Sequence, residues 1–320
     1  MQADAVMQIL PESIKSALET TNELIDSFEE IRIRIKRPIV LRRDNVSWYL
    51  KFDGGLKRKL VDEEEGIILS RKEMEQILVR ASRFSVYAAQ QQIKEGYITI
   101  QGGHRIGICG EVMEQDGNIC GIRNIYSYNI RIAHEVRGCA ECIYPFLWKN
   151  ERLLNTLIIS PPGCGKTTLL RDLLRMISDG DDEHPALTVC IADERGEIAA
   201  CIDAVPQNDI GKNTDVMDKG AKTKTLSLML RSMSPQVIAA DEAGNQEDIE
   251  TFLQAKKWGV GIVTTVHGSI NHNRLSCEHN ERVFERYVEI ENVTKRKYIV
   301  YDEGKNILCE SVCKNDISGL

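Results

Sequence analysis

The stretch SPPGCGKTT, residues 160–168, constrains the fold of this chain more than any other feature of its sequence. It approaches the phosphate-loop pattern G-x-x-x-x-G-K-[ST], except that Ser160 stands where the pattern has its first glycine. The loop follows the apolar run TLIIS and precedes TTLLRDLLRMIS, in which leucine and isoleucine recur at helical spacing. A strand, a tight loop and a helix in this order predict a phosphate-binding site at a helix N-terminus.

The residue types of the loop indicate how a nucleotide would be held. Gly163 and Gly165 let the backbone curl closely around phosphates. Lys166 is expected to reach the β- and γ-phosphates, and Thr167 to place its hydroxyl on Mg²⁺. The expected ligands are therefore ATP and Mg²⁺, and the expected nucleotide-binding residues are Ser160, Pro161, Pro162, Gly163, Cys164, Gly165, Lys166, Thr167 and Thr168.

Ser160 replaces a glycine that acts through its backbone alone, so a serine serves if its φ is negative. Pro161 and Pro162 push the preceding residue toward extended geometry, which favours that outcome. Thr168 is expected to pack or hydrogen-bond at the start of the helix. Cys164 is expected to be a reactive thiol, because helix N-termini activate thiols, but to have no catalytic role.

A second apolar run, in QVIAADEAG, ends in the acids Asp241 and Glu242. Such a pair alone is an ordinary strand end. Together with the phosphate loop, it predicts that Asp241 shares Mg²⁺ with Thr167 and that Glu242 is the general base that polarises water.

Two further apolar runs end in polar residues of interest. IADERGEIAA ends in Asp193 and Glu194, and Glu194 could orient water or metal; Arg195 with Glu197 could equally form a structural ion pair. GIVTTVHG ends in His267, which could sense the γ-phosphate or be a hydrogen-bonded structural histidine, and brings Thr264 and Thr265 as lesser polar candidates. Ligands of open α/β sheets collect at the carboxyl ends of strands, which favours the functional interpretations.

Arginines often stabilise the charge of a transferring phosphate. The candidates in this sequence are Arg105, Arg123, Arg131 and Arg231. Each could also be a surface or ion-pair residue.

The sequence predicts two domains, a mixed α/β domain at residues 1–148 and a P-loop domain at residues 149–320. In the first, EIRIRIKRPIVLRR alternates like one half-buried strand with a basic outer face. Ser70 and Glu73 predict a capping box, and Gly102-Gly103 predicts a hairpin turn. In the second, strands alternate with helices, which predicts a doubly wound α/β fold. Residues 205–227 are polar and predict a long loop near the active edge.

Composition narrows the class of protein. The 320 residues carry a net charge of −7, which argues against an overall nucleic-acid binder but leaves a local basic surface open. We expect no signal peptide or membrane span, and hence a cytoplasmic protein, or one held peripherally at a membrane by partners. The ten cysteines, including the pair Cys139 and Cys142 and the pair Cys309 and Cys313, favour reduced thiols over disulfides or structural zinc.

At the motifs EIRIRI, FSVYAAQQQIKEGYITIQGGHRIGICGEV, YNIRIAHEVRGCA, SPPGCGKTTLLRD, IADERGEIAA, VPQNDIGKNTDVMD, LRSMSPQVIAADEAG and TTVHG, the sequence resembles the stage III sporulation protein AA family. The match spans roughly residues 28–270. That family is grouped with the secretion-type ATPases of type II and type IV systems. The segment DKGAKTK, residues 218–224, departs from the family's loop, so no contact is carried over there.

The resemblance implies a RecA-like P-loop ATPase core behind a smaller mixed α+β N-terminal domain. It implies a homo-hexameric ring that hydrolyses ATP and drives a channel between mother cell and forespore, working with membrane proteins of that channel. It matches Glu194 to an acidic box and His267 to a histidine box, and it turns Arg105 and Arg131 toward the phosphates.

Two other interpretations remain open. One is a nucleic-acid-associated P-loop ATPase, supported by the basic run at residues 32–43 and tested by salt-dependent binding of single strands. The other is a nucleotide-gated scaffold with little turnover, against which Lys166 and Glu242 argue.

Overall fold

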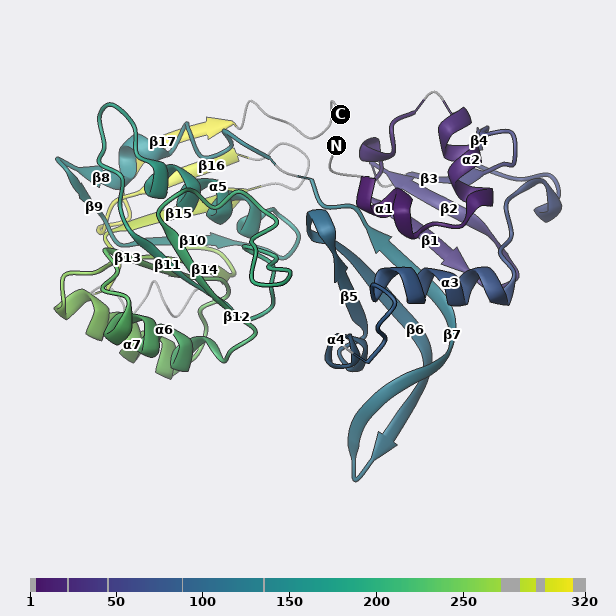
Figure 1. Ribbon diagram of the computed structural model, residues 1–320. Coiled ribbons are helices and arrows are strands. Elements are labelled where there is room, and N and C mark those ends of the chain that lie inside the picture. The colour runs from purple at the N-terminus through teal and green to yellow at the C-terminus, as the bar shows by residue number, and fades with distance from the viewer. Residues whose placement is uncertain are drawn as a thin grey trace. The chain divides into compact units, whose positions relative to one another are not determined.

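The computed structural model describes residues 4–312 apart from residues 22, 45, 88, 135, 272–282 and 292–296. The chain forms two compact units that divide between residues 134 and 135 (Figure 1). Each unit has its own sheet and its own buried core. Among the described residues, no helix is both long enough and apolar enough to cross a membrane.

The described residues of the first unit form a seven-stranded sheet in the order β4-β3-β2-β1-β7-β6-β5. The strands are β1 (Glu30–Arg34), β2 (Arg37–Arg43), β3 (Val46–Leu50), β4 (Leu56–Lys57), β5 (Tyr97–Ile100), β6 (His104–Gln115) and β7 (Asn118–Arg131). The helices are α1 (Asp4–Ile9), α2 (Glu12–Thr20), α3 (Arg71–Ala81) and α4 (Gln90–Lys94), with short 3₁₀ turns at Ile25–Ser27, Glu63–Glu65 and Gln101–Gly103.

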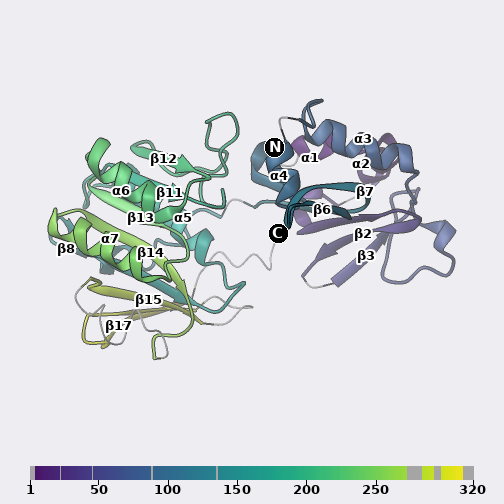
Figure 2. The same cartoon turned by 90° about the horizontal axis from the view of Figure 1, so that it is seen from below.

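One face of this sheet is covered by helices. Helices α1, α2 and α3 lie along the same side of the sheet in both views (Figures 1 and 2). Ile31 and Ile33 of β1 are fully buried, and they belong to one cluster with Met74 and Ile77 of α3. Strand β1 alternates buried and partly exposed residues because only one of its faces packs against these helices.

The predicted single strand at residues 30–43 is wrong, because it is two strands joined by a tight turn. Arg34 pairs with Arg37, and Lys36 has a left-handed φ of 57°. The turn carries none of the glycine or asparagine residues that usually mark a reversal, so the alternation appeared continuous.

Ion pairs neutralise part of the positive charge of residues 30–43. Arg32 lies 2.7 Å from Glu30, Arg37 lies 3.0 Å from Glu63, and Arg43 lies 2.6 Å from Glu23. These pairs reduce the charge available to a polyanion and weaken the nucleic-acid interpretation.

Two local predictions for the first unit are confirmed. Ser70 and Glu73 form a reciprocal capping box at the start of α3. Strands β5 and β6 form an antiparallel hairpin around Gly102 and Gly103, whose φ angles are 83° and 76°. Strands β6 and β7 then continue as a long two-stranded hairpin beyond the end of the sheet (Figure 1).

The described residues of the second unit form an eight-stranded sheet in the order β12-β11-β13-β14-β10-β15-β16-β17. The strands are β10 (Thr156–Ser160), β11 (Val189–Asp193), β12 (Thr214–Asp218), β13 (Val237–Ala240), β14 (Gly261–His267), β15 (Arg286–Glu291), β16 (Lys297–Tyr301) and β17 (Ile307–Val312). The helices are α5 (Lys166–Asp179), α6 (Lys222–Ser232) and α7 (Gln246–Lys257), with a 3₁₀ turn at Tyr144–Leu147 and a small separate ribbon of β8 (Trp148–Lys149) and β9 (Arg152–Leu153).

Both faces of the central strands β10, β11, β13 and β14 are buried, which confirms the doubly wound prediction. Leu169 and Leu173 of α5 pack in one cluster with Ile158 of β10. Leu226 of α6 and Phe252 of α7 pack in the other cluster, on residues of opposite parity in the same strands. Burial on both faces explains why these strands are continuous apolar runs rather than alternating ones.

Residues 136–148, which we assigned to the first domain, pack with the second unit. Cys139, Ala140 and Tyr144 are buried in the same cluster as α5. The backbone N–H of Ala140 donates to the buried carboxylate of Asp172, at 2.9 Å. The predicted boundary after residue 148 therefore lies inside the second unit.

The long loop predicted at residues 205–227 is wrong in its second half. Residues 214–218 form β12, which pairs in parallel with β11, and α6 begins at Lys222. Strand β12 is only partly buried because it is the edge of the sheet, so its polar sequence gave no strand signal.

Removing the Ser70 cap of α3 tests how much this local interaction contributes to the stability of the first unit. We expect Ser70→Ala to lower the free energy of unfolding by about 1 kcal/mol, since the helix N-terminus loses its side-chain acceptor. Urea unfolding followed by circular dichroism measures this. Ser232→Ala, which removes an exposed hydrogen bond to Leu228 O within α6, is the matched control and should change stability by less than about 0.5 kcal/mol. Equal effects of the two changes would contradict the prediction.

Candidate functional site

Strands β11, β13, β14 and β10 are neighbours and run in parallel, so their carboxyl ends meet at one edge of the sheet. Ser160 is the register partner of His267, and Ala240 is the partner of both Ala192 and Thr264. This pairing brings the phosphate loop, Asp241, Glu242 and His267 to the same edge. Ligands of open α/β sheets collect there.

The phosphate loop has the geometry of an anion cradle. Strand β10 ends at Ser160 and α5 begins at Lys166, as the sequence predicts. Gly163 and Gly165 have φ angles of 78° and 84°, in the left-handed region that other residues rarely adopt. Within the described residues, the backbone N–H groups of residues 163–168 have no protein acceptor. Unpaired donors at a helix N-terminus fit a phosphate group.

Ser160 is accommodated as part of the strand. It is fully buried, it is not among the residues with positive φ, and its hydroxyl donates to Pro161 O at 2.9 Å. The serine in place of glycine therefore leaves the bend unstrained.

Cys164 does not have the environment of a reactive thiol. Its side chain is only 2% exposed and belongs to the core beneath α5. Burial removes the solvent access that thiol reactivity needs, so the expectation of a reactive Cys164 is wrong.

Lys166 is a buried cation held by several acceptors. Its Nζ lies 2.8 Å from His267 Nδ1 and donates to Ser160 O and Pro161 O, at 3.4 and 3.5 Å. Burial lowers the pKa of Lys166, and the nearby carboxylates of Asp241 and Glu242 oppose this effect. An arriving phosphate anion would compensate the burial of this charge.

A hydroxyl and a carboxylate meet where a magnesium ion is expected. Thr167 Oγ1 donates to Asp241 Oδ2 at 2.5 Å, and Thr265 Oγ1 donates to Asp241 Oδ1. Oxygen donors of this kind suit Mg²⁺, which binds few protein ligands and keeps several waters. The residues present therefore fit the ion, and Thr167 and Asp241 are the ones that would hold it.

Glu242 follows Asp241 in the sequence and has an unusual backbone conformation. Its φ is 54°, which is costly for a residue with a side chain and often found at functional sites. Its Oε1 lies 3.0 Å from His267 Nε2, and its Oε2 lies 2.8 Å from Arg195 Nη1.

His267 connects the lysine with the acid. The ammonium group of Lys166 can only donate hydrogen bonds, so Nδ1 of His267 is the acceptor. Nε2 of His267 therefore carries the ring hydrogen and donates it to Glu242. The histidine is thus oriented by both charged residues at once. The structure therefore confirms the hydrogen-bonded histidine, and sensing of the γ-phosphate stays a prediction.

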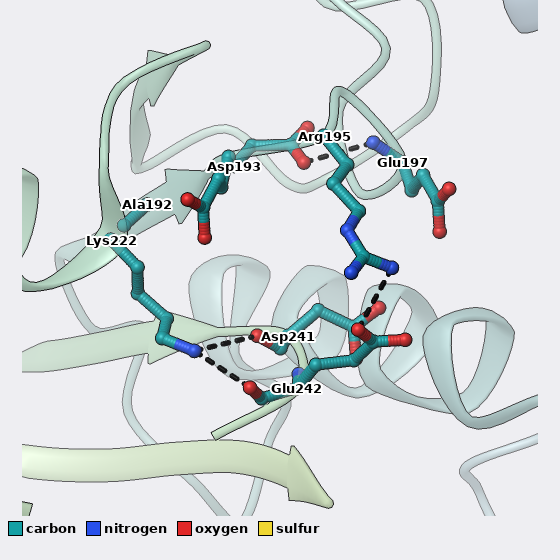
Figure 3. A pocket seen from close by; sticks show the side chains of 8 residues that line it. Ala192, Asp193, Arg195, Glu197, Lys222, Asp241 and Glu242 are labelled. Carbon is teal, nitrogen blue, oxygen red and sulfur yellow. Dashed lines mark hydrogen bonds and ion pairs between the residues drawn. The ribbon is translucent and has the colours of Figure 1, made fainter. Parts of the chain in front are cut away.

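Asp193 and Glu194 differ in environment. Asp193 is 2% exposed, and its carboxylate accepts from the backbone N–H groups of Glu197, Ile198 and Ala199 at 2.8–3.2 Å. It therefore fixes the loop that follows β11. Glu194 is exposed and lines a small cavity of about 80 Å³ together with Ala192, Asp193, Arg195, Glu197, Lys222, Asp241 and Glu242 (Figure 3).

Arg195, Thr265 and Lys222 are the contacts that sequence reasoning missed or undervalued. Figure 3 shows Arg195 reaching the carboxylate of Glu242 from one side and Lys222 reaching the backbone behind it from the other. Arg195 had been considered only as a partner of Glu197. Thr265 lies on the strand that ends in His267, and this position was the one sequence signal that could have placed it in the site. No sequence signal placed Lys222 there.

The candidate arginines are distributed over both units. The guanidinium carbon Cζ of Arg105, in β6, lies 3.7 Å from the ring centroid of Tyr97. Arg105 is also the register partner of Arg131. Arg123 forms an ion pair with Glu111 in the long hairpin. Arg231 is exposed on α6 and donates to Ser227 O, so it belongs to the outer surface of that helix.

Among known proteins, this chain is similar to members of one sporulation family. A family model described as "Sporulation stage III, protein AA" matches residues 1–307. Stage III sporulation protein AA of Bacillus subtilis (strain 168) is 40% identical over 311 residues, which covers 95% of this chain and 96% of that protein. Protein SEEDLING PLASTID DEVELOPMENT 1 of Arabidopsis thaliana is 31% identical over 156 residues, which covers 47% of this chain and 22% of that protein.

Solved structures show the same fold at low sequence identity. The ATPase DotB of Yersinia pseudotuberculosis has a TM-score of 0.58 at 13% identity, covering 92% of this chain and 80% of that chain. The pilus retraction motor PilT with bound ADP has a TM-score of 0.52 at 14% identity, covering 92% of this chain and 82% of that chain. These likenesses confirm the predicted fold class, an α/β RecA-like P-loop core with a smaller mixed α+β N-terminal domain.

The carboxylate of Asp193 should be needed for the loop after β11. We expect Asp193→Asn to lower the free energy of unfolding of the second unit by about 1–3 kcal/mol, because one of two accepting oxygens becomes a donor facing buried N–H groups. Urea unfolding measures this. The exposed neighbour Glu194→Gln should change stability by less than about 0.5 kcal/mol. A stable Asp193→Asn variant would show that the loop is held by other contacts.

Proposed function

The chain belongs to the stage III sporulation protein AA family, and from that premise we propose that it is a magnesium-dependent ATPase that drives a channel complex during sporulation. The observation that carries the proposal is the convergence at one sheet edge of a buried phosphate-loop lysine, a hydroxyl–carboxylate pair and a strand-end glutamate. A P-loop protein without turnover would have no need of the glutamate.

Binding uses the donors of the loop. The N–H groups of residues 163–168 and the amine of Lys166 hold the phosphates of ATP, while Thr167 and Asp241 hold the ion. Mg²⁺, when bound, neutralises phosphate charge and polarises the bond that is to be cleaved. Lys166 exchanges its present acceptors, backbone carbonyls and His267, for phosphate oxygens.

Hydrolysis uses Glu242 as the general base. Each oxygen of its carboxylate already accepts one donor, from His267 or from Arg195, and keeps a lone pair for a water molecule. Glu242 orients that water and takes its proton. His267 aligns the carboxylate and links it to Lys166, so the position of the base depends on what the lysine binds.

The remaining site residues act around this core. Glu194, which is exposed and lines the cavity, orients water or the hydrated ion. Arg105 and Arg131, adjacent on the sheet of the first unit, stabilise phosphate charge during turnover. We assign residues 136–148 to the ATPase unit, with which they pack, instead of the domain at residues 1–148.

The motor works as a homo-hexameric ring that acts on membrane proteins of the channel between mother cell and forespore. Support comes from the family and from the fold shared with an ATPase and a pilus retraction motor. The protein is cytoplasmic and meets the membrane through those partners. Ion pairs reduce the positive charge of the basic run in the first unit, which argues against nucleic acid as the substrate.

Two substitutions separate nucleotide binding from turnover. Lys166→Ala should abolish hydrolysis and weaken ATP binding, because the loop loses its cation. Glu242→Gln should keep binding and lower the turnover number about a hundredfold or more, because the base is lost. Phosphate release and titration of a fluorescent ATP analogue measure the two quantities. The exposed Lys224→Ala variant is the control and should behave as wild type.

Two results would contradict the proposal of an ATPase with turnover. Normal turnover by purified Lys166→Ala would overturn the ATPase proposal. Slow turnover of the wild type that stays slow with its membrane partners present, and equals that of Glu242→Gln, would favour the nucleotide-gated scaffold.

Ring assembly should depend on nucleotide. We expect the wild type to increase in mass to a hexamer when Mg²⁺ and ATP are added, and Lys166→Ala to remain in the smaller species. Light scattering coupled to size exclusion measures both. A strictly monomeric wild type under every condition would contradict the ring.

A further inference from the structure

We propose that Lys222 is a positioning residue for Glu242, fixing the strained backbone from which the general base projects. This inference rests on the proposed ATPase function and goes beyond it, because Lys222 lies outside both the phosphate loop and the acid pair. Its amine reaches the catalytic acids from behind, through their backbone rather than their carboxylates (Figure 3).

Lys222 binds the carbonyl side of the acid pair. Its Nζ donates to Glu242 O at 2.6 Å and to Asp241 O at 3.5 Å. The amide side is held separately, since Glu242 N donates to Asp241 Oδ1 at 3.0 Å and to Thr265 Oγ1 at 2.9 Å. Both peptide groups that define the φ and ψ angles of Glu242 are therefore restrained.

The restraint matters because of the conformation it holds. Glu242 has a φ of 54°, which a residue with a side chain adopts at a cost. That conformation directs its carboxylate toward His267 Nε2 and Arg195 Nη1. A relaxed backbone would turn the carboxylate away from these partners and from the water that it orients.

A buried carboxylate keeps Lys222 in place. Asp248 Oδ2 lies 3.0 Å from Lys222 Nζ, and the two residues are 1% and 8% exposed. Asp248 also accepts from Gly244 N at 3.0 Å and from Thr223 Oγ1 at 3.1 Å, and it completes the capping box of α7. The lysine thus joins α6 and α7 to the end of β13.

The location of this contact argues for more than general stability. Lys222 lines the same cavity as Asp193, Asp241 and Glu242, and the peptide that it binds is that of the proposed base. A buried ion pair adds little net stability, because desolvation offsets much of its attraction. Its effect is to define one geometry, and the geometry that it defines here is that of Glu242.

The test replaces Lys222 with methionine, which has a similar length and no charge. We expect Lys222→Met to lower kcat roughly ten- to a hundredfold while the dissociation constant of a fluorescent ATP analogue stays within about twofold of wild type. In hydrogen exchange of the nucleotide-free protein, the amides of residues 242–244 should exchange faster and those within α5 should not. Lys224→Met, on the exposed face of the same helix, is the control and should match wild type.

A double variant addresses folding. Lys222→Met leaves Asp248 buried and unpaired, so Lys222→Met/Asp248→Asn removes both charges and should restore the melting temperature without restoring kcat. The inference falls if Lys222→Met or the folded double variant turns over like wild type, or if exchange at residues 242–244 is unchanged. Failure of the proposed function would give a different result. In that case the wild type would either hydrolyse no ATP or show hydrolysis that persists in the Lys166→Ala variant.

Discussion

The parallel register of four neighbouring strands is the constraint on which the rest of the site depends. Ser160 lies opposite His267, and Ala240 lies opposite Ala192 on one side and Thr264 on the other. Side chains that are far apart in the sequence become neighbours because their strands end at the same level. A slip of one residue would reverse the faces of a strand and separate the phosphate loop from its acids.

The two lysines at this edge differ in their partners. Lys166 is held by backbone carbonyls and His267, and burial lowers its pKa. Lys222 is paired with Asp248 and satisfied by the carbonyls of Asp241 and Glu242. Lys166 therefore has partners that an anion can replace, whereas Lys222 has a carboxylate that is buried with it.

The sequence predicted what depends on local spacing and failed where distant contacts decide. The phosphate loop, α5 and the apolar strands were found because their signals lie within a few residues. The reversal at Lys36 and the edge strand β12 were missed because neither carries a turn residue or an apolar pattern. No prediction covered strands β15 and β16, although their tyrosine, valine and isoleucine residues favour strands. The partners of Glu242 come from three separate segments, so no spacing rule could have joined them.

The two cations that touch Glu242 differ in what they can do. Arg195 is largely exposed, on a loop whose start is fixed by Asp193, and a solvent-exposed ion pair contributes about 0–1 kcal/mol. Such a contact can exchange with water or with a ligand at little cost. Lys222 is buried, and removing it would leave Asp248 without a counter-charge. The exposed arginine is therefore suited to exchange its partner for a ligand, while the buried lysine is suited to keep the glutamate in one conformation.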